Sequence, residues 1–152
     1  MTATNDWTVV ELTTEQTYPL RRAVLRNDTP TDEVSFPEDA WPGAHHLGVI
    51  DDGVLIGTST WVPRPLAVQP EAIAVQLRGM ATAPSYQRRG VGAALVAVGC
   101  QRAIDAGAQL VWANARDAAL SFYTHHGFVV AGEGFIDATT MLPHHVVIRM
   151  LS

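Results

Sequence analysis

The most informative segment of this sequence is Gln76-Leu-Arg-Gly-Met-Ala-Thr-Ala-Pro-Ser-Tyr-Gln-Arg-Arg-Gly-Val-Gly-Ala-Ala-Leu-Val96. It begins as an extended apolar run, turns near Pro84, and leads into a helix-forming run from Ala93 to Ala106. The first N–H groups of a helix lack intrahelical partners and lie at the positive end of the helix dipole. Gly90 and Gly92 leave that backbone open to an anion, so the segment predicts a phosphate-binding turn.

Glycine-rich turns are common, and an ordinary helix start explains the same residues without a ligand. The spacing does exclude two better-known phosphate sites. The segment lacks G-x-x-x-x-G-K-[ST], which rules out a P-loop, and G-x-G-x-x-G, which rules out a dinucleotide-binding turn.

Two motifs nevertheless point to one family. The run Gln87-Arg-Arg-Gly-Val-Gly-Ala93 resembles motif A, [QR]-x-x-G-x-[GA], of the GCN5-related N-acetyltransferases (GNATs). The run Ala119-Leu-Ser-Phe-Tyr-Thr-His-His-Gly-Phe128 resembles their motif B, A-x-x-[FL]-Y-x-x-x-G-F, and follows at the expected distance. The resemblance implies an N-acetyltransferase with acetyl-CoA as cosubstrate. The specific motifs are confined to residues 76–128.

Length and composition agree with a single globular domain over residues 1–152. Hydrophobic residues make up 47% and charged residues 16%, as in a compact enzyme. The net charge of −5 argues against nucleic acid as a partner. Positive charge is local, at Arg78, Arg88 and Arg89, which suits one small anionic ligand. Cys100 is the only cysteine, so an intramolecular disulfide is excluded.

We expect no membrane partner and a cytoplasmic location, because residues 1–6 form a polar, loose start and no apolar run approaches membrane length. We also expect no metal site. The adjacent histidines diverge, and no cysteine or carboxylate lies at ligand spacing from them.

Hydrophobic patterning predicts the element order β-α-β-β-β-α-β-α-β-β. The expected strands are 8–12, 46–50, 54–61, 72–82, 109–113, 128–131 and 145–150, and the expected helices are 16–26, 93–106 and 117–124. The buried run 109–113 is expected to lie parallel to 72–82. With the resemblance, the fold class is α/β of the α+β kind: a mostly antiparallel twisted sheet, flanked by helices, whose parallel pair is splayed around the CoA site.

Local signals refine the helix ends and faces. Thr13 and Gln16 predict a capping box, with Pro19 in the opening turn of the first helix. Asp117 is expected to cap the last helix. In the long helix the expected inward stripe is Leu95, Val98, Arg102 and Ala106, with Val91 a turn earlier.

The resemblance also assigns residues to the cosubstrate, because in GNATs the motif A loop holds the pyrophosphate and the preceding strand pairs with the pantetheine. An N–H of that strand, near Met80, serves the oxyanion. The implied set is Met80, Ala81, Thr82, Gln87, Arg88, Arg89, Gly90, Val91, Gly92, Ala93, Asn114, Arg116, Ser121 and Phe122. Where the family often has asparagine, this chain has Arg116. Either Arg116 reaches a CoA phosphate, Asn114 substitutes for the missing amide, or both residues only cap the loop.

Tyr123 is the candidate general acid, since a phenol with a pKa of about 10 stays protonated at neutral pH and can donate to a thiolate. A core tyrosine is the alternative, but the match to motif B favours the acid. The base is less clear. Many GNATs have a glutamate where this chain has Arg78, and arginine cannot act as a base. His46, His144, His145 and Glu71 remain as candidates, with His144 preferred; solvent could also take the proton.

We expect Arg78 to bind a carboxylate of the acceptor. The Pro-rich loop 31–44 carries Phe36 and Trp41, which either cover the acceptor site or anchor the loop to the core. The expected substrate-binding residues are Arg78, Phe36 and His46. The resemblance implies a small-molecule amine acceptor and allows a homodimer. Two other functions stay open: an acyl-CoA sensor without turnover, separable by CoA thiol release, and protein N-terminal or lysine acetylation by the same chemistry.

Overall fold

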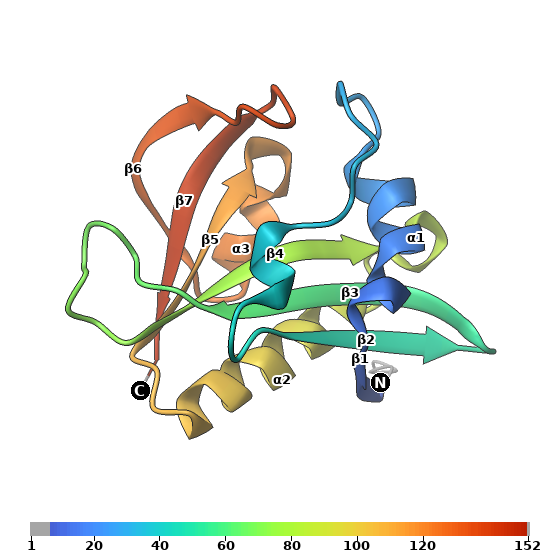
Figure 1. The fold of residues 1–152 in the computed structure, drawn as a ribbon, viewed down its shortest axis with the longest axis horizontal. Coiled ribbons are helices and arrows are strands. Elements are labelled where there is room, and N and C mark those ends of the chain that lie inside the picture. The colour runs from blue at the N-terminus through green and yellow to red at the C-terminus, as the bar shows by residue number, and fades with distance from the viewer. Residues whose placement is uncertain (1–6, 152) are drawn as a thin grey trace.

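A computed structural model of the chain describes residues 7–151, and the loose start expected at residues 1–6 lies outside this range. The elements follow the predicted order (Figure 1). They are β1 (Val9–Leu12), α1 (Thr14–Leu25), the 3₁₀ turn η1 (Pro37–Ala40), β2 (His45–Asp51), β3 (Val54–Pro63), β4 (Ala74–Thr82), η2 (Pro84–Tyr86), α2 (Val91–Asp105), β5 (Leu110–Arg116), η3 (Asp117–Ala119), α3 (Leu120–His125), β6 (Val129–Ile136) and β7 (Pro143–Met150).

The strands form one seven-stranded sheet in the order β1-β2-β3-β4-β5-β7-β6. The expected parallel pair is confirmed: β4 runs parallel to β5, and all other neighbours are antiparallel. The parallel pairing covers only Ala74–Gln76 against Leu110–Trp112. Beyond Gln76 the two strands diverge, which leaves one edge of β4 without a strand partner.

The two long helices cover opposite faces of the sheet. Trp61 on β3 packs against α2, whereas its neighbour Thr60 bonds to Arg21 of α1. Successive strand residues point to opposite faces, so these contacts place α1 and α2 on either side. The main core lies on the α2 face. It is built by α2 and α3 against the strands and includes Leu47, Ile56, Trp61, Leu77, Leu95, Val111, Tyr123 and Val147.

The expected inward stripe of α2 is confirmed for Val91 and Leu95, and Val98 is partly buried against the core. It was wrong for Arg102 and Ala106, which are exposed. The buried residues are Val91, Leu95, Val96, Gly99, Cys100 and Ala103. The face is set by Gly99, where a β-carbon would stand 1.8 Å from Trp61, so the helix turns this glycine toward the sheet. Arg102 is exposed and pairs with Glu11 at 2.6 Å.

Of three predictions about the helix ends, one is confirmed and two are wrong. The Thr13–Gln16 capping box is present. Pro19, however, lies in the second turn of α1 because the helix already begins at Thr14, two residues before the expected start. Asp117 does not cap α3, which begins three residues later; its Oδ1 instead contacts His145 Nδ1 at 2.6 Å.

The closing strands are antiparallel as expected but longer than the patterning suggested. β5 continues to Arg116 because β7 pairs with it up to His144, and β6 continues to Ile136, which pairs with Pro143. Within residues 7–151, no helix is long and apolar enough to cross a membrane.

Gly99→Ala is predicted to destabilise the protein by about 3 kcal/mol, although alanine is the better helix former, because the new methyl group would overlap the buried Trp61 ring. Urea unfolding followed by circular dichroism measures the change. Gln101→Ala, at an exposed position of the same helix, is the control and should stay within about 0.5 kcal/mol of the wild type. Equal stability of Gly99→Ala and wild type would contradict the packing described here.

Candidate active site

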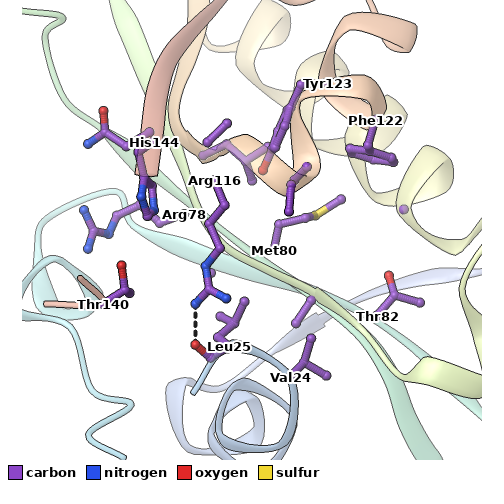
Figure 2. A pocket seen from close by; sticks show the side chains of 18 of the residues that line it. Val24, Leu25, Arg78, Met80, Thr82, Arg116, Phe122, Tyr123, Thr140 and His144 are labelled. Carbon is purple, nitrogen blue, oxygen red and sulfur yellow. Dashed lines mark hydrogen bonds between the residues drawn. The ribbon is translucent and has the colours of Figure 1, made fainter. Parts of the chain in front are cut away.

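A cleft of about 1200 Å³ opens where β4 and β5 diverge. Its walls come from β4, β5, the end of α1, the glycine turn before α2, α3 and the β6–β7 turn (Figure 2). Most residues of the expected cosubstrate set line it: Met80, Ala81, Thr82, Gln87, Arg88, Gly90, Gly92, Ala93, Asn114, Arg116, Ser121 and Phe122. The remaining two, Arg89 and Val91, do not.

The glycine turn has the backbone geometry of an anion site. Arg88 and Gly90 both adopt left-handed φ angles, of 64° and 85°, directly before the first residue of α2. Such turns point successive N–H groups into one concavity. Gly92 permits close packing, since a β-carbon there would stand 2.9 Å from Phe122. Gln87 fixes the turn to the strand by donating from Nε2 to the Thr82 carbonyl at 3.1 Å.

Arg89 braces this turn from outside the cleft. Its guanidinium lies over the rings of Tyr86 and Trp7, at 4.8 and 5.7 Å from their centroids. The indole of Trp7 donates to the Arg89 carbonyl at 2.8 Å. Of the adjacent residues Arg88 and Arg89, only Arg88 therefore lines the cleft. Val91 is part of the core. No local sequence pattern indicated this contact of Trp7, which lies far away along the chain.

Tyr123 belongs to the core but presents its hydroxyl to the cleft (Figure 2). Its ring stands edge-on to those of Phe122 and Phe128, with both centroids at 5.3 Å. Burial raises the pKa of Tyr123 to about 12, so the phenol keeps its proton throughout the neutral range. Among the described residues its hydroxyl has no hydrogen-bond partner. The group can therefore donate to a ligand.

His144 is the base candidate that lines the cleft. Its Nδ1 lies 2.8 Å from the Leu142 carbonyl. A carbonyl only accepts, so Nδ1 carries the hydrogen, and in the neutral ring Nε2 then carries a lone pair. His145 and Glu71 do not line the cleft: His145 contacts Asp117, and Glu71 is exposed in the β3–β4 loop.

His46 also lies outside the cleft, in a buried polar network beneath loop 31–44. Its two ring nitrogens contact Thr60 Oγ1 at 2.8 Å and Thr14 Oγ1 at 3.0 Å. Thr60 in turn accepts from Arg21 at 2.7 Å. The fully buried Arg21 forms a two-pronged ion pair with Asp39, both bonds 2.9 Å. The network ties loop 31–44 to β3 and α1. Its histidine is therefore placed to support the loop.

Phe36 and Arg78, two of the expected substrate-binding residues, line the cleft at the end where we expect the acceptor. Arg78 lies over the Phe36 ring, 4.9 Å from its centroid. Its Nε is buried without a hydrogen bond; the nearest acid, Glu38 Oε1, stands at 3.8 Å and is likewise unbonded. Glu38 uses its other oxygen on Arg64 at 2.8 Å. Trp41 does not line the cleft and lies over Arg64 instead.

Comparison with known proteins agrees with this geometry. Residues 8–128 match the model of the Acetyltransferase (GNAT) family. The chain belongs to this family. It is 34% identical to the N-acetyltransferase YitI of Bacillus subtilis (strain 168) over 127 residues, which are 84% of this chain and 85% of YitI.

Solved structures share the GNAT fold. An acyl-CoA N-acyltransferase from Pseudomonas aeruginosa superposes with a TM-score of 0.74 at 24% identity, covering 95% of this chain and 98% of its own. FeeM, an N-acyl amino acid synthase from uncultured soil microbes, gives 0.78 at 15% identity, with 94% and 91% covered. This GNAT chain is an acyltransferase that moves an acyl group from acyl-CoA to an amine.

The buried network predicts a pH-dependent stability. Burial, with the charge of Arg21, lowers the pKa of His46 below its ordinary 6.5, so the unfolded chain binds the proton first as the pH falls. The free energy of unfolding should therefore decrease from about pH 7 to about pH 5. Denaturant titrations of wild type and His46→Gln measure this, and the variant should show the shallower decrease. Parallel curves would show that His46 is not held neutral.

The glycine turn predicts acetyl-CoA affinity. Gly90→Asp should weaken binding about a hundredfold or more, because a carboxylate would stand at the N-terminus of α2 where phosphate is expected. Calorimetric titration measures the change. Gly132→Asp is the matched control, since it has the same charge and a φ of 78°, has no atom within 4 Å of the new β-carbon, and lies on β6 outside the cleft lining. Equal binding by both variants would refute the turn as the phosphate site.

Proposed function

We propose that the protein transfers an acetyl group from acetyl-CoA to the amine of a small, carboxylate-bearing acceptor by direct attack, with Tyr123 as general acid and His144 as general base. One observation carries this proposal. The Tyr123 hydroxyl and His144, whose Nε2 carries a lone pair in the neutral ring, line the same cleft as the glycine turn, and within residues 7–151 neither the hydroxyl nor Nε2 has a hydrogen-bond partner.

The cleft suits acetyl-CoA. The left-handed turn before α2 and Arg88 offer N–H groups and a cation to the pyrophosphate. The edge of β4 beyond Gln76 has no strand partner, so its backbone groups near Met80 are available to the pantetheine arm and to the thioester oxygen. Bound acetyl-CoA would supply the activated carbonyl carbon that the amine attacks.

The proton transfers balance in this arrangement. As the amine nitrogen bonds to the carbonyl carbon, His144 Nε2 takes the proton that the nitrogen loses. As the carbon–sulfur bond breaks, the sulfur leaves with the electron pair, and Tyr123 gives it the phenolic proton. Because burial keeps the pKa of Tyr123 near 12, the phenol stays protonated at every pH below that value, including those at which part of the amine is neutral.

Arg78 supports the carboxylate on the acceptor. The guanidinium is half-buried in the cleft wall, and its Nε is ion-paired with Glu38 Oε1 at 3.8 Å but forms no hydrogen bond at that distance. A buried, incompletely bonded cation favours an anionic partner. A glutamate at this strand position could deprotonate the acceptor, whereas Arg78 would orient the acceptor through its carboxylate.

Two alternatives receive less support. A sensor without turnover has no need for the unbonded acid and base that line the cleft. A protein or peptide acceptor needs an open acceptor end, whereas here Arg116 reaches across the cleft from β5 to the Leu25 carbonyl (Figure 2). The cytoplasmic location and the homodimer stay predictions.

Tyr123→Phe should lower kcat about a hundredfold with little change in the KM for acetyl-CoA, because the ring packing is kept while the leaving thiolate loses its acid. Release of CoA thiol, followed with a chromogenic disulfide in an amine screen, measures the rate. Tyr18→Phe, on α1 and outside the cleft lining, is the control and should match the wild type. Full activity of Tyr123→Phe would remove the residue from the mechanism.

A further inference from the structure

Two arginines meet at one backbone oxygen in the acceptor end of the cleft. Arg116, at the end of β5, donates from its guanidinium to the carbonyl of Leu25, the last residue of α1 (Figure 2). Arg26 donates from Nη1 to the same carbonyl at 3.2 Å and from Nε to the Glu33 carbonyl at 2.6 Å. All these acceptors are neutral. The two guanidinium groups therefore share one uncharged oxygen.

This cation pair has no acidic partner in the part of the chain that the structure describes. Within residues 7–151, no carboxylate oxygen lies within 4.0 Å of Arg26 or Arg116. Asp137 acts on both, and Glu33 on Arg26, only through longer-range charge. Both side chains are partly buried, and burial together with the charge of Arg116 lowers the pKa of Arg26. Two desolvated like charges without a counter-ion form a place where an anion is stabilised.

The pair is separate from Arg78 but belongs to the same cleft. Arg78 comes from β4, whereas Arg116 faces His144 across the β5–β7 register. Figure 2 shows Arg116 extending from β5 toward α1. The cleft thus offers two cationic positions, one on β4 and one at the end of α1.

We infer that the acceptor carries two acidic groups besides its amine, in the manner of an amino dicarboxylate, with one carboxylate on Arg78 and the second on the Arg26–Arg116 pair. This inference rests on the proposed function. The second carboxylate would replace the Leu25 carbonyl as the partner of Arg116. A guanidinium matches the two oxygens of a carboxylate with two N–H groups, which a single carbonyl cannot do.

The competing explanation is structural. A cation at the C-terminus of a helix is stabilised by the helix dipole, so Arg116 and Arg26 could serve only to cap α1. If the two arginines only cap the helix, the cleft should not discriminate between dicarboxylates and monocarboxylates. Ligand charge therefore separates the two explanations.

The first test measures binding without turnover. Wild type with bound CoA is titrated calorimetrically with malonate, succinate, glutarate and adipate, and with the monocarboxylates of equal length. One dicarboxylate should bind about tenfold or more tightly than its monocarboxylate partner. Arg116→Gln and Arg26→Gln should each remove this preference, Arg116→Lys should retain part of it, and Arg22→Gln, an exposed arginine of α1 outside the cleft, should retain all of it.

The second test uses matched acceptors. Glutamate and glutamine share their amine and α-carboxylate and differ only in the second acidic group, as do aspartate and asparagine. Wild type should use the acidic member of a pair with a kcat/KM about tenfold higher or more, and Arg116→Gln should bring the two values together. Circular dichroism confirms that the variants are folded.

The outcomes are distinct. If no dicarboxylate is preferred, or if Arg116→Gln keeps the preference, the inference is overturned. It is equally overturned if Arg116→Gln weakens acetyl-CoA binding and leaves dicarboxylate binding unchanged, which would assign Arg116 to the cosubstrate. If neutral amino acids are used as well as acidic ones, the inference fails and the proposed function stands. If no amine releases CoA thiol, the proposed function fails, and the dicarboxylate titration still judges the anion site.

Discussion

The incomplete pairing of β4 with β5 is the constraint from which the rest of the site follows. The strands part after Gln76, and β4 bends there: its register with β3 shifts between Thr58 and Thr60, and Gly79 takes a φ of 58°. A β-carbon at Gly79 would stand 3.2 Å from Arg21 Nε and 3.1 Å from Phe36. The bulge is thus fitted to the side chains beneath loop 31–44, and the cleft opens because β4 turns toward them.

Arg21 is the unusual element of that support. A fully buried guanidinium is costly unless its donors are bonded. Four hydrogen bonds, to Asp39 twice, Val34 and Thr60, satisfy its two terminal nitrogens, while Nε has no hydrogen-bond partner. Removal of one partner alone leaves a buried charge without compensation, which typically costs about 3–5 kcal/mol. The network therefore fixes the position of loop 31–44, and with it Phe36, more firmly than an exposed loop of this length would otherwise be held.

The order of the elements and the glycine turn could be predicted because they depend on short-range signals: strand alternation and motifs within a few residues. The partners of the charged side chains could not. Arg21 meets Asp39, Trp7 meets Arg89, and Arg116 meets Leu25 only after the chain has folded. The buried face of α2 was predicted only in part, since it depends on the fit of one glycine to a tryptophan of another element.

The arginines at the acceptor end of the cleft bond to backbone carbonyls, and this has an evolutionary consequence. Arg26 and Arg116 bond to the carbonyls of residues 25 and 33, and Arg21 to that of Val34. Every amino acid has a carbonyl, so drift in the side chains at these positions leaves the arginines held. Substitutions at these positions would consequently change the lining of the pocket while its cationic frame stays in place, so that acceptor choice could change without rebuilding the scaffold.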